Sequence, residues 1–264
     1  MDMTIEQYIA NPMGKNNAVM SALTRETLRK TYMKKFDNLL LRENGVIEYH
    51  LYKDEKNNTY WAHIKVPSET VKKFYYDVVL KFSATEKVEE AGNNLFKYNV
   101  RFYSNDPAFV YTYAYVFRKN DLFIKELSSK MSKEALKKEA KEKNPTGDVG
   151  YVKTIYFAYL VMQNRGLNKK IKFDAEAKPL DPKILLNNIE DADSKIFRRQ
   201  EEGSKVSKRK KIELDKDTAK NISKYINSDV STDRLVVSTT KKVGQIKSKS
   251  EIKSSKRVSS TKRK

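Results

Sequence analysis

The chain of 264 residues carries 54 Lys and Arg against 34 Asp and Glu, a formal net charge of +20 that attracts polyanions such as nucleic acid or acidic lipid surfaces. It is long enough for one sizeable domain or two small ones, and it has no Cys, which excludes disulfides, thiolate nucleophiles and cysteine-ligated zinc. It has neither an apolar run long enough to span a membrane nor the start of a secretory signal, so we expect a protein that is not membrane-inserted and not secreted.

The N-terminal third begins with an expected arm and a long helix. Residues 1–20 predict an extended N-terminal arm, with a short helix over residues 4–9. From Thr24 onward, TRETLRKTYMKKFDNLLLREN predicts an amphipathic helix because apolar side chains recur at helical spacing, and Asn44-Gly45 should end it. The shared apolar face would comprise Leu28, Tyr32, Phe36, Leu39 and Leu40.

Four segments with alternating polarity then predict an antiparallel sheet. VIEYHLY and TYWAHIKV should form a hairpin in which Tyr49 pairs with Ala62. Further strands are expected at 75–82 and 95–103, separated by a polar, turn-rich loop.

The segment FVYTYAYVF, residues 109–117, fits two conformations. Asp106-Pro107 suits the start of a helix, but the period of two and the Tyr, Phe, Val and Thr content favour a fifth strand. That strand would place five rings on one face, namely Phe109, Tyr111, Tyr113, Tyr115 and Phe117. Such a stripe more often packs in a core, but it could also form a protein interface or a stacking surface for single-stranded bases. Pairing with the strand at 95–103 would set Lys97 and Arg101 opposite Tyr115 and Tyr111.

The rest of the chain completes the expected organisation. A charged helix is predicted at 124–143 and a more apolar one at 149–166, ending at Gly166. The fold class expected is α+β: an antiparallel sheet of four or five strands with an N-terminal helix and two C-terminal helices, over residues 21–172. A linker should follow at 173–202, where two prolines occur, and then a disordered Lys/Ser-rich basic tail at 203–264.

Candidate nucleic-acid-binding residues occur on the hairpin and the neighbouring strand. Trp61 is expected to be exposed among Lys53, Lys65 and His50, where it could contact a partner or a nucleotide. The candidates in the domain are Tyr52, Trp61, Lys65, Lys97 and Arg101.

The tail carries most of the excess charge, with 19 Lys and Arg against six Asp and Glu from Gly203 onward. Basic runs of this kind neutralise phosphates and release counterions, so binding would be independent of sequence and sensitive to salt. A short helix is expected over 216–226. The phosphate-binding candidates are Lys205, Lys208, Arg209, Lys210, Lys211, Lys256, Arg257, Lys262, Arg263 and Lys264.

Catalytic and metal-binding signals are weak. Glu48, His50 and His63 on adjacent strands could bind zinc in principle, with Glu48 opposite His63, but solvated or structurally satisfied histidines are more common. No phosphate-cradling glycine loop or nucleophile elbow is apparent. We therefore expect no catalytic residue, no metal, no cofactor and no small-molecule substrate.

The strings NPMGKNNAV, REN-G-IEYHLYKD, FYSNDPAF and YTYAYVF-KNDLFIKEL make the first 170 residues resemble uncharacterised proteins encoded by tailed phages. The resemblance implies a virion-associated or DNA-associated role in a bacterial host, with the protein in the host cytoplasm or the virion. It transfers no catalytic residue.

Two functions follow as expectations. The first is a non-enzymatic nucleic-acid-binding protein, with DNA favoured over RNA, that uses the tail for sequence-independent phosphate contacts. The alternative is a phage structural or assembly protein, such as a virion, neck or tail component, that binds copies of itself or other virion proteins. An enzyme with an unrecognised site is a third, less favoured reading.

Overall fold

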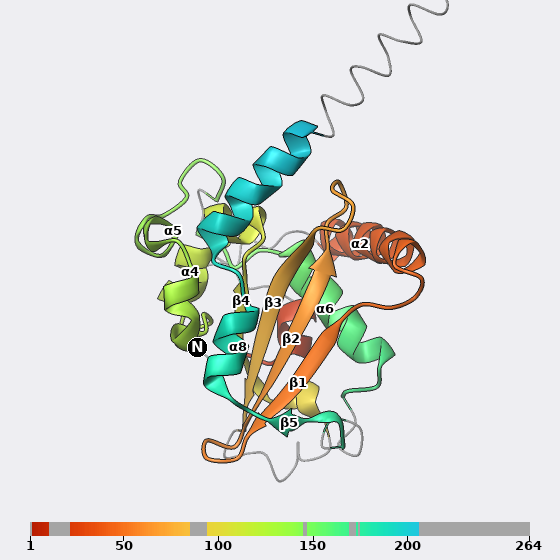
Figure 1. Cartoon of the computed structure of the whole chain (residues 1–264), viewed down its shortest axis with the longest axis vertical. Coiled ribbons are helices and arrows are strands. Elements are labelled where there is room, and N and C mark those ends of the chain that lie inside the picture. The colour runs from red at the N-terminus through yellow and green to blue at the C-terminus, as the bar shows by residue number, and fades with distance from the viewer. Residues whose placement is uncertain are drawn as a thin grey trace, which may run out of the picture. The chain divides into compact units, whose positions relative to one another are not determined.

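The fold is organised around a five-stranded mixed sheet in the order β4-β3-β2-β1-β5 (Figure 1). The structure is a computed structural model, and it describes residues 2–10, 22–84, 94–144, 147–168, 173 and 175–205. The strands are β1 (Tyr49–Asp54), β2 (Thr59–Pro67), β3 (Tyr75–Ser83), β4 (Asn99–Ser104) and β5 (Lys178–Pro179). The first four pair antiparallel and β5 joins β1 in parallel, so the α+β class and the four antiparallel strands are confirmed.

The hairpin register differs from the predicted one by two residues. Leu51 is opposite Ala62, which leaves Tyr49 opposite Ile64. Because side chains alternate with a period of two, the shift leaves every side chain on its expected face. The Asp54 side chain accepts hydrogen bonds from the N–H groups of Lys56 and Asn57, which fixes the turn.

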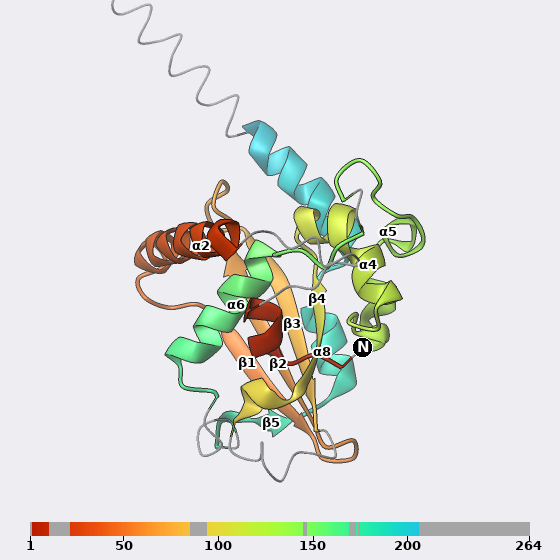
Figure 2. The same cartoon turned by 180° about the vertical axis from the view of Figure 1, so that it is seen from behind.

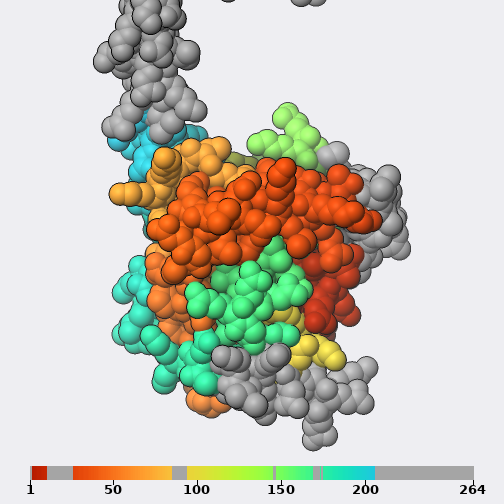
Figure 3. Space-filling model, turned by 90° about the vertical axis from the view of Figure 1, so that its right-hand side faces the viewer, coloured from red at the N-terminus to blue at the C-terminus, as the bar shows by residue number. Residues whose placement is uncertain are grey.

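Three helices cover one face of the sheet: α1 (Ile5–Ala10), α2 (Ala22–Arg42) and α6 (Lys153–Asn164) (Figure 2). The ring of Phe36 on α2 packs 5.7 Å from that of Phe157 on α6. Tyr8 on α1 lies 4.8 Å from Phe102 of β4. The space-filling view shows α2 lying across the surface beside α6 (Figure 3).

The two helix ends predicted from glycine are confirmed. After α2, Asn44 and Gly45 have positive φ angles of 53° and 76°, and the Gly45 N–H donates to the Leu40 carbonyl. After α6, Gly166 has a φ of 68° and the next N–H, from Leu167, donates to Met162. Both are left-handed caps that satisfy carbonyls at a helix end.

The expected N-terminal arm is wrong for the residues that the structure describes. The short helix predicted over 4–9 is present as α1, but its side chains belong to the core rather than to an arm. Met3, Ile5, Tyr8 and Ile9 are buried. The Tyr8 hydroxyl donates to the Gly150 carbonyl and accepts from the Val152 N–H, which fixes α1 against the start of α6. Residues 11–20 lie outside the described residues.

The linker predicted at 173–202 is also wrong. These residues contain β5, α8 (Pro182–Asn188) and a helix that begins at residue 192 and reaches residue 205, and they belong to the compact unit Met1–Ser204. The two prolines shape ordered elements: Pro179 lies in β5, and Pro182 is the first residue of α8, after the Asp181 cap. This segment covers the other face of the sheet, as Figure 1 shows.

Residues 109–117 are helical, which corrects the favoured strand. A π-helix, η2 (Phe109–Tyr113), leads into α4 (Ala114–Lys119). Asp106 begins the helix because its carboxylate accepts from the Ala108 N–H and its carbonyl accepts from Val110. Lys97 and Arg101 therefore do not face a strand of rings. The outer edge of β4 instead pairs with residues 122–124, through Phe102.

The charged helix predicted at 124–143 is broken in two. A 3-10 helix, η3 (Lys125–Lys130), is followed by α5 (Lys133–Lys137). The buried apolar residues Leu127, Met131 and Leu136 are four and then five residues apart, a spacing that no single α-helical face maintains. The second predicted helix is confirmed as α6. The helix predicted at 216–226 lies outside the described residues.

The packing of Tyr113 leaves little room for a side chain at Gly150. A Cβ atom at Gly150 would lie 2.7 Å from Cε1 and 2.9 Å from Oη of Tyr113. We expect Gly150→Ala to lower the free energy of unfolding by roughly 1–3 kcal/mol in urea titrations. Gly203→Ala should be neutral or stabilising, since its helical site is open.

A double-mutant cycle tests the cause. In a Tyr113→Ala background the ring is absent, so adding Gly150→Ala should cost little. An equal cost in both backgrounds would contradict this packing.

Candidate phosphate-binding cleft

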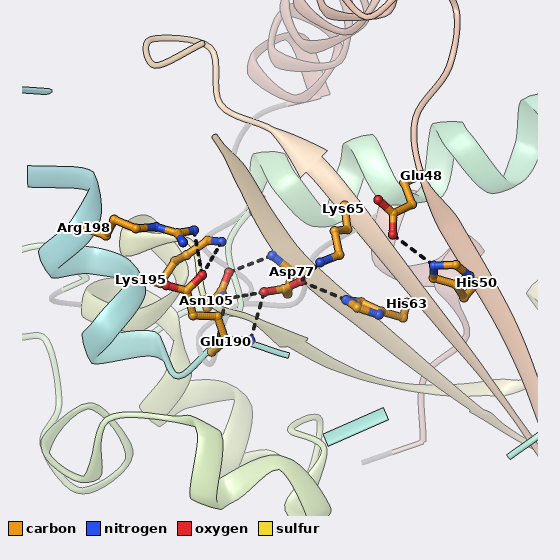
Figure 4. A network of polar contacts seen from close by, with 9 residues as sticks. All are labelled: Glu48, His50, His63, Lys65, Asp77, Asn105, Glu190, Lys195 and Arg198. Carbon is orange, nitrogen blue, oxygen red and sulfur yellow. Dashed lines mark hydrogen bonds and ion pairs between the residues drawn. The ribbon is translucent and has the colours of Figure 1, made fainter. Parts of the chain in front are cut away.

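A buried carboxylate on the second face of the sheet organises the candidate site (Figure 4). Asp77 of β3 is 2% exposed, and its Oδ1 lies 2.9 Å from Nε2 of His63 on β2. Its Oδ2 accepts hydrogen bonds from the Asn105 side chain at 2.8 Å and from the Glu190 N–H at 3.3 Å. The Lys65 ammonium lies 3.8 Å from Oδ1.

The protonation state of Asp77 follows from these contacts. Burial acts to raise its pKa, but the hydrogen bond from His63 and the positive charges of Lys195 and Lys65 outweigh burial and hold the pKa below its usual value. An ionised carboxylate can only accept hydrogen bonds, so Nε2 of His63 carries the proton. Asp77 thus joins β2, the end of β4 and the segment after α8.

A cleft of about 490 Å³ opens above this carboxylate. Its basic side chains come from β2, the loop before β3, η3 and the helix at 192–205, and they are Lys65, Lys73, Lys130, Lys195 and Arg198. Its acidic side chains are Asp77, Glu190 and Asp191. We call this hollow the basic cleft.

The carboxylates of the basic cleft are already engaged with cations. Glu190 accepts hydrogen bonds from the Lys195 ammonium at 2.9 Å and from the Arg198 guanidinium at 2.7 Å. Both cations also lie over the ring of Phe74, at 4.9 and 5.2 Å from its centroid. Arg198 retains 48% exposure of its side chain, so part of its guanidinium remains available to a ligand.

Lys73 adds a second available cation at the rim of the basic cleft. It is exposed, has a positive φ of 58°, and makes no ion pair within the described part of the chain. Together with the half-buried Lys65, these side chains offer donors to a tetrahedral anion, since Arg binds phosphate through paired N–H groups and Lys as a point charge.

The predicted aromatic contact residues do not reach solvent. Trp61 and Tyr52 are 5% and 8% exposed, which corrects their expected role. The Trp61 indole donates to Thr59, and the Lys81 ammonium lies 4.8 Å from the centre of its ring. Asn188 at the end of α8 bonds to the Tyr52 hydroxyl. The expected exposed face is therefore covered.

The structure does not bring the three predicted cations of the domain together at one site. Lys65 lines the basic cleft, whereas Lys97 and Arg101 do not. Lys97 is exposed in η1 (Leu95–Lys97). The Arg101 guanidinium is paired with Asp121, whose hydrogen bonds to Lys125 and Arg101 lower the pKa of its carboxyl to about 2. Of the tail candidates, Lys205 ends the described helix and is exposed, and the other nine lie outside the described residues.

The weak zinc hypothesis is not supported by the strand register. His50, not Glu48, is opposite His63, with 6.3 Å between ring centroids, and Glu48 is hydrogen-bonded to His50. Across the described ranges, no three His, Asp or Glu side chains gather where they could hold a metal ion.

Sequence reasoning missed Lys73, Lys130, Lys195 and Arg198. One signal was available for the last two. Beyond the Asp181-Pro182 helix start, buried apolar residues recur at intervals of four, three and four positions, namely Leu185, Ile189, Ala192 and Ile196. That spacing predicts helices with a buried face, and basic residues beside that face would then border a hollow.

No protein-family model, curated protein or solved structure matches this chain. Within the described residues, none of the helices combines the length and the apolar character needed to cross a membrane.

A second buried carboxylate, Asp106, provides a contrast to Asp77. Its oxygens accept hydrogen bonds from the Ala108 N–H at 3.3 Å and the Thr154 hydroxyl at 3.2 Å. Burial raises its pKa, in spite of the opposing effects of these hydrogen bonds and of Lys153. The two carboxylates should therefore respond to replacement in opposite ways.

We expect Asp77→Asn to lower the free energy of unfolding at neutral pH by about 1–3 kcal/mol, because an amide nitrogen replaces one of the oxygens that accept from His63, Asn105 and the Glu190 N–H and leaves a buried donor unpaired. Asp106→Asn can keep both contacts, with its amide oxygen accepting from the Ala108 N–H and its amide nitrogen donating to the Thr154 hydroxyl, so it should change stability by less than about 1 kcal/mol. Urea titrations of both variants measure these effects.

The pH dependence has opposite signs. The stabilisation from Asp77 is present above the unfolded pKa of about 4 and is lost as the pH falls through the lowered folded value. The effect of Asp77→Asn should therefore shrink in acid. Asp106 loses stabilisation as the pH rises through its raised value, so Asp106→Asn should gain stability relative to wild type with rising pH. If the free energy of unfolding of both variants, relative to wild type, changed with pH in the same direction, the opposite pKa shifts of Asp77 and Asp106 would be contradicted.

Proposed function

We propose that this protein binds the phosphate backbone of nucleic acid, without catalysing a reaction, through the basic cleft and the basic tail. The observation that carries the proposal is the convergence of five cations on one hollow whose three carboxylates are already paired. Such a site attracts phosphate more than neutral or cationic ligands.

The position of each cation suits a backbone ligand. Lys73 and Arg198 are exposed at the rim, where a phosphate can approach without displacing core side chains. Lys195 is 5% exposed and is neutralised by Glu190, so it positions that carboxylate and contributes less directly. Lys and Arg charges can follow the phosphates of any sequence, so the cleft is compatible with binding independent of sequence.

The tail adds charge in the same chain. Its runs KVSKRKK and KSSKRVSSTKRK follow the helix that forms one wall of the basic cleft. For duplex DNA, each phosphate that the protein neutralises makes the slope of log affinity against log salt concentration steeper by about 0.9. Phosphate contacts do not distinguish DNA from RNA. DNA is favoured because the sequence resembles phage proteins. The same resemblance favours a location in the bacterial host cytoplasm or the virion.

An assembly role in a phage particle is the second candidate. Ile184 on α8 and Phe197 on the helix at 192–205 are 52% and 63% exposed, and apolar side chains of this kind occur at protein interfaces. A defined oligomer or a complex with a virion protein, formed in the absence of nucleic acid, would support this function over the first.

The proposed cleft predicts a selective loss of binding. In the full chain, Lys73→Gln/Arg198→Gln should weaken binding to a short DNA duplex by about tenfold or more and lower the salt slope by about 2. Fluorescence anisotropy between about 50 and 200 mM salt measures both quantities. The matched control is Arg29→Gln/Lys34→Gln, which removes the same charges from exposed positions on α2 and should cost about twofold at most. Equal losses in the two variants would mean that net charge, and not the cleft, determines affinity.

The tail is tested separately. Replacing Lys208, Arg209, Lys210 and Lys211 by Gln in the full chain should lower the salt slope by up to about 4, with the thermal midpoint unchanged. An unchanged slope would exclude this run from the contact.

A further inference from the structure

A second hollow, of about 700 Å³, lies beside η2 and α5. Val110, Tyr111, Ala135 and Ala140 line it together with charged residues of the segment 138–143. We call it the Tyr111 hollow. It shares no lining residue with the basic cleft, and its volume is the larger of the two.

Tyr111 is unusual among the five rings of 109–117. Its side chain is 48% exposed, whereas Phe109 and Phe117 are fully buried and Tyr113 and Tyr115 are partly buried. The ring belongs to a π-helix, a rare turn that is frequent at functional sites. The ammonium of Lys143 lies 5.6 Å from its centroid. An exposed ring beside a cation is the combination on which a base stacks while its phosphate is neutralised.

Shared lining residues connect the Tyr111 hollow to the basic cleft through a neighbouring hollow. Between them is a third hollow of about 330 Å³, formed by η3, α5 and the start of the helix at 192–205. It shares Lys130 and Asp191 with the basic cleft. It shares Ser132 and Glu134 with the Tyr111 hollow. The three hollows are therefore neighbours, in the order basic cleft, third hollow and Tyr111 hollow, and we call this row the groove.

We propose that this groove holds single-stranded nucleic acid, with phosphates at the basic cleft and a base stacked on Tyr111. This inference rests on the proposed function, which supplies the phosphate contacts, and it adds that the bound nucleic acid is single-stranded. A duplex keeps its bases stacked inside and cannot offer one to Tyr111, whereas an unpaired strand can. A linear polymer also suits a long groove better than a compact ligand does.

The negative charge of Glu134 in the third hollow leads to a second, independent prediction. Glu134 and Asp193 line the third hollow, and Glu134 makes no ion pair within the described residues. Its carboxylate would repel a passing phosphate. Glu134→Gln should therefore tighten the binding of a strand that follows the groove, whereas a change elsewhere on the surface should not.

The test uses the full chain, an oligothymidylate of roughly 20 nucleotides and an abasic deoxyribose-phosphate strand of the same length. Tyr111→Ala should weaken binding of the oligothymidylate by about tenfold, and Tyr111→Phe by less than about twofold, because the ring stacks and the hydroxyl does not. Neither change should alter binding of the abasic strand. Glu134→Gln should tighten binding of both strands by about twofold or more.

Each contrary result has a distinct meaning. If Tyr111→Ala binds oligothymidylate as tightly as wild type, or if wild type binds both strands equally, base stacking is overturned and the phosphate-binding function stands. If Glu134→Gln leaves both affinities unchanged, the strand does not follow the groove. If wild type binds neither strand nor a duplex near physiological salt, the proposed function itself fails.

Discussion

The arrangement of helices on both faces of the sheet depends on the buried carboxylate of Asp77. A charge taken out of water must be matched by donors and cations, or it costs several kcal/mol. Here the donors come from β2, from the residue after β4 and from the backbone at Glu190. Satisfying one carboxylate therefore fixes the C-terminal helices against the sheet. The same contact holds in place the wall that carries Lys195 and Arg198, so the shape of the basic cleft and the stability of the fold have a common origin.

Much of the fold could be predicted from local patterns. The four antiparallel strands alternate in polarity, and α2 and α6 end at glycine in the left-handed region, so sequence and structure agree there. Residues 109–117 have a composition that favours a strand, yet they are helical because Asp106 caps the helix and because Phe109 and Phe117 are buried by it. The edge of β4 that this strand was expected to occupy is taken by residues 122–124.

The candidate site could be predicted only in part. Lys65 was expected, but its neighbours in the cleft come from distant elements: Asp77 and Glu190 are separated by 113 positions. A face of alternating polar residues such as His63 and Lys65 is typical of a solvated sheet surface, and only the ordered segment after residue 173 shows that it is covered. If that segment were a linker, as predicted, the face that carries Trp61 would be open to solvent.

The position of α1 has a consequence for how the protein reaches its native state. Tyr8 is enclosed by contacts to Gly150 and Val152, more than 140 positions away, and Tyr151 bonds to the carbonyl of Ile9. During synthesis the N-terminal helix must therefore wait, with its apolar side chains unprotected, until α6 has emerged from the ribosome. Contacts of such high sequence separation slow folding and expose the nascent chain to aggregation. The docking of α1 against the start of α6 is therefore expected to be a late step in the folding of this domain.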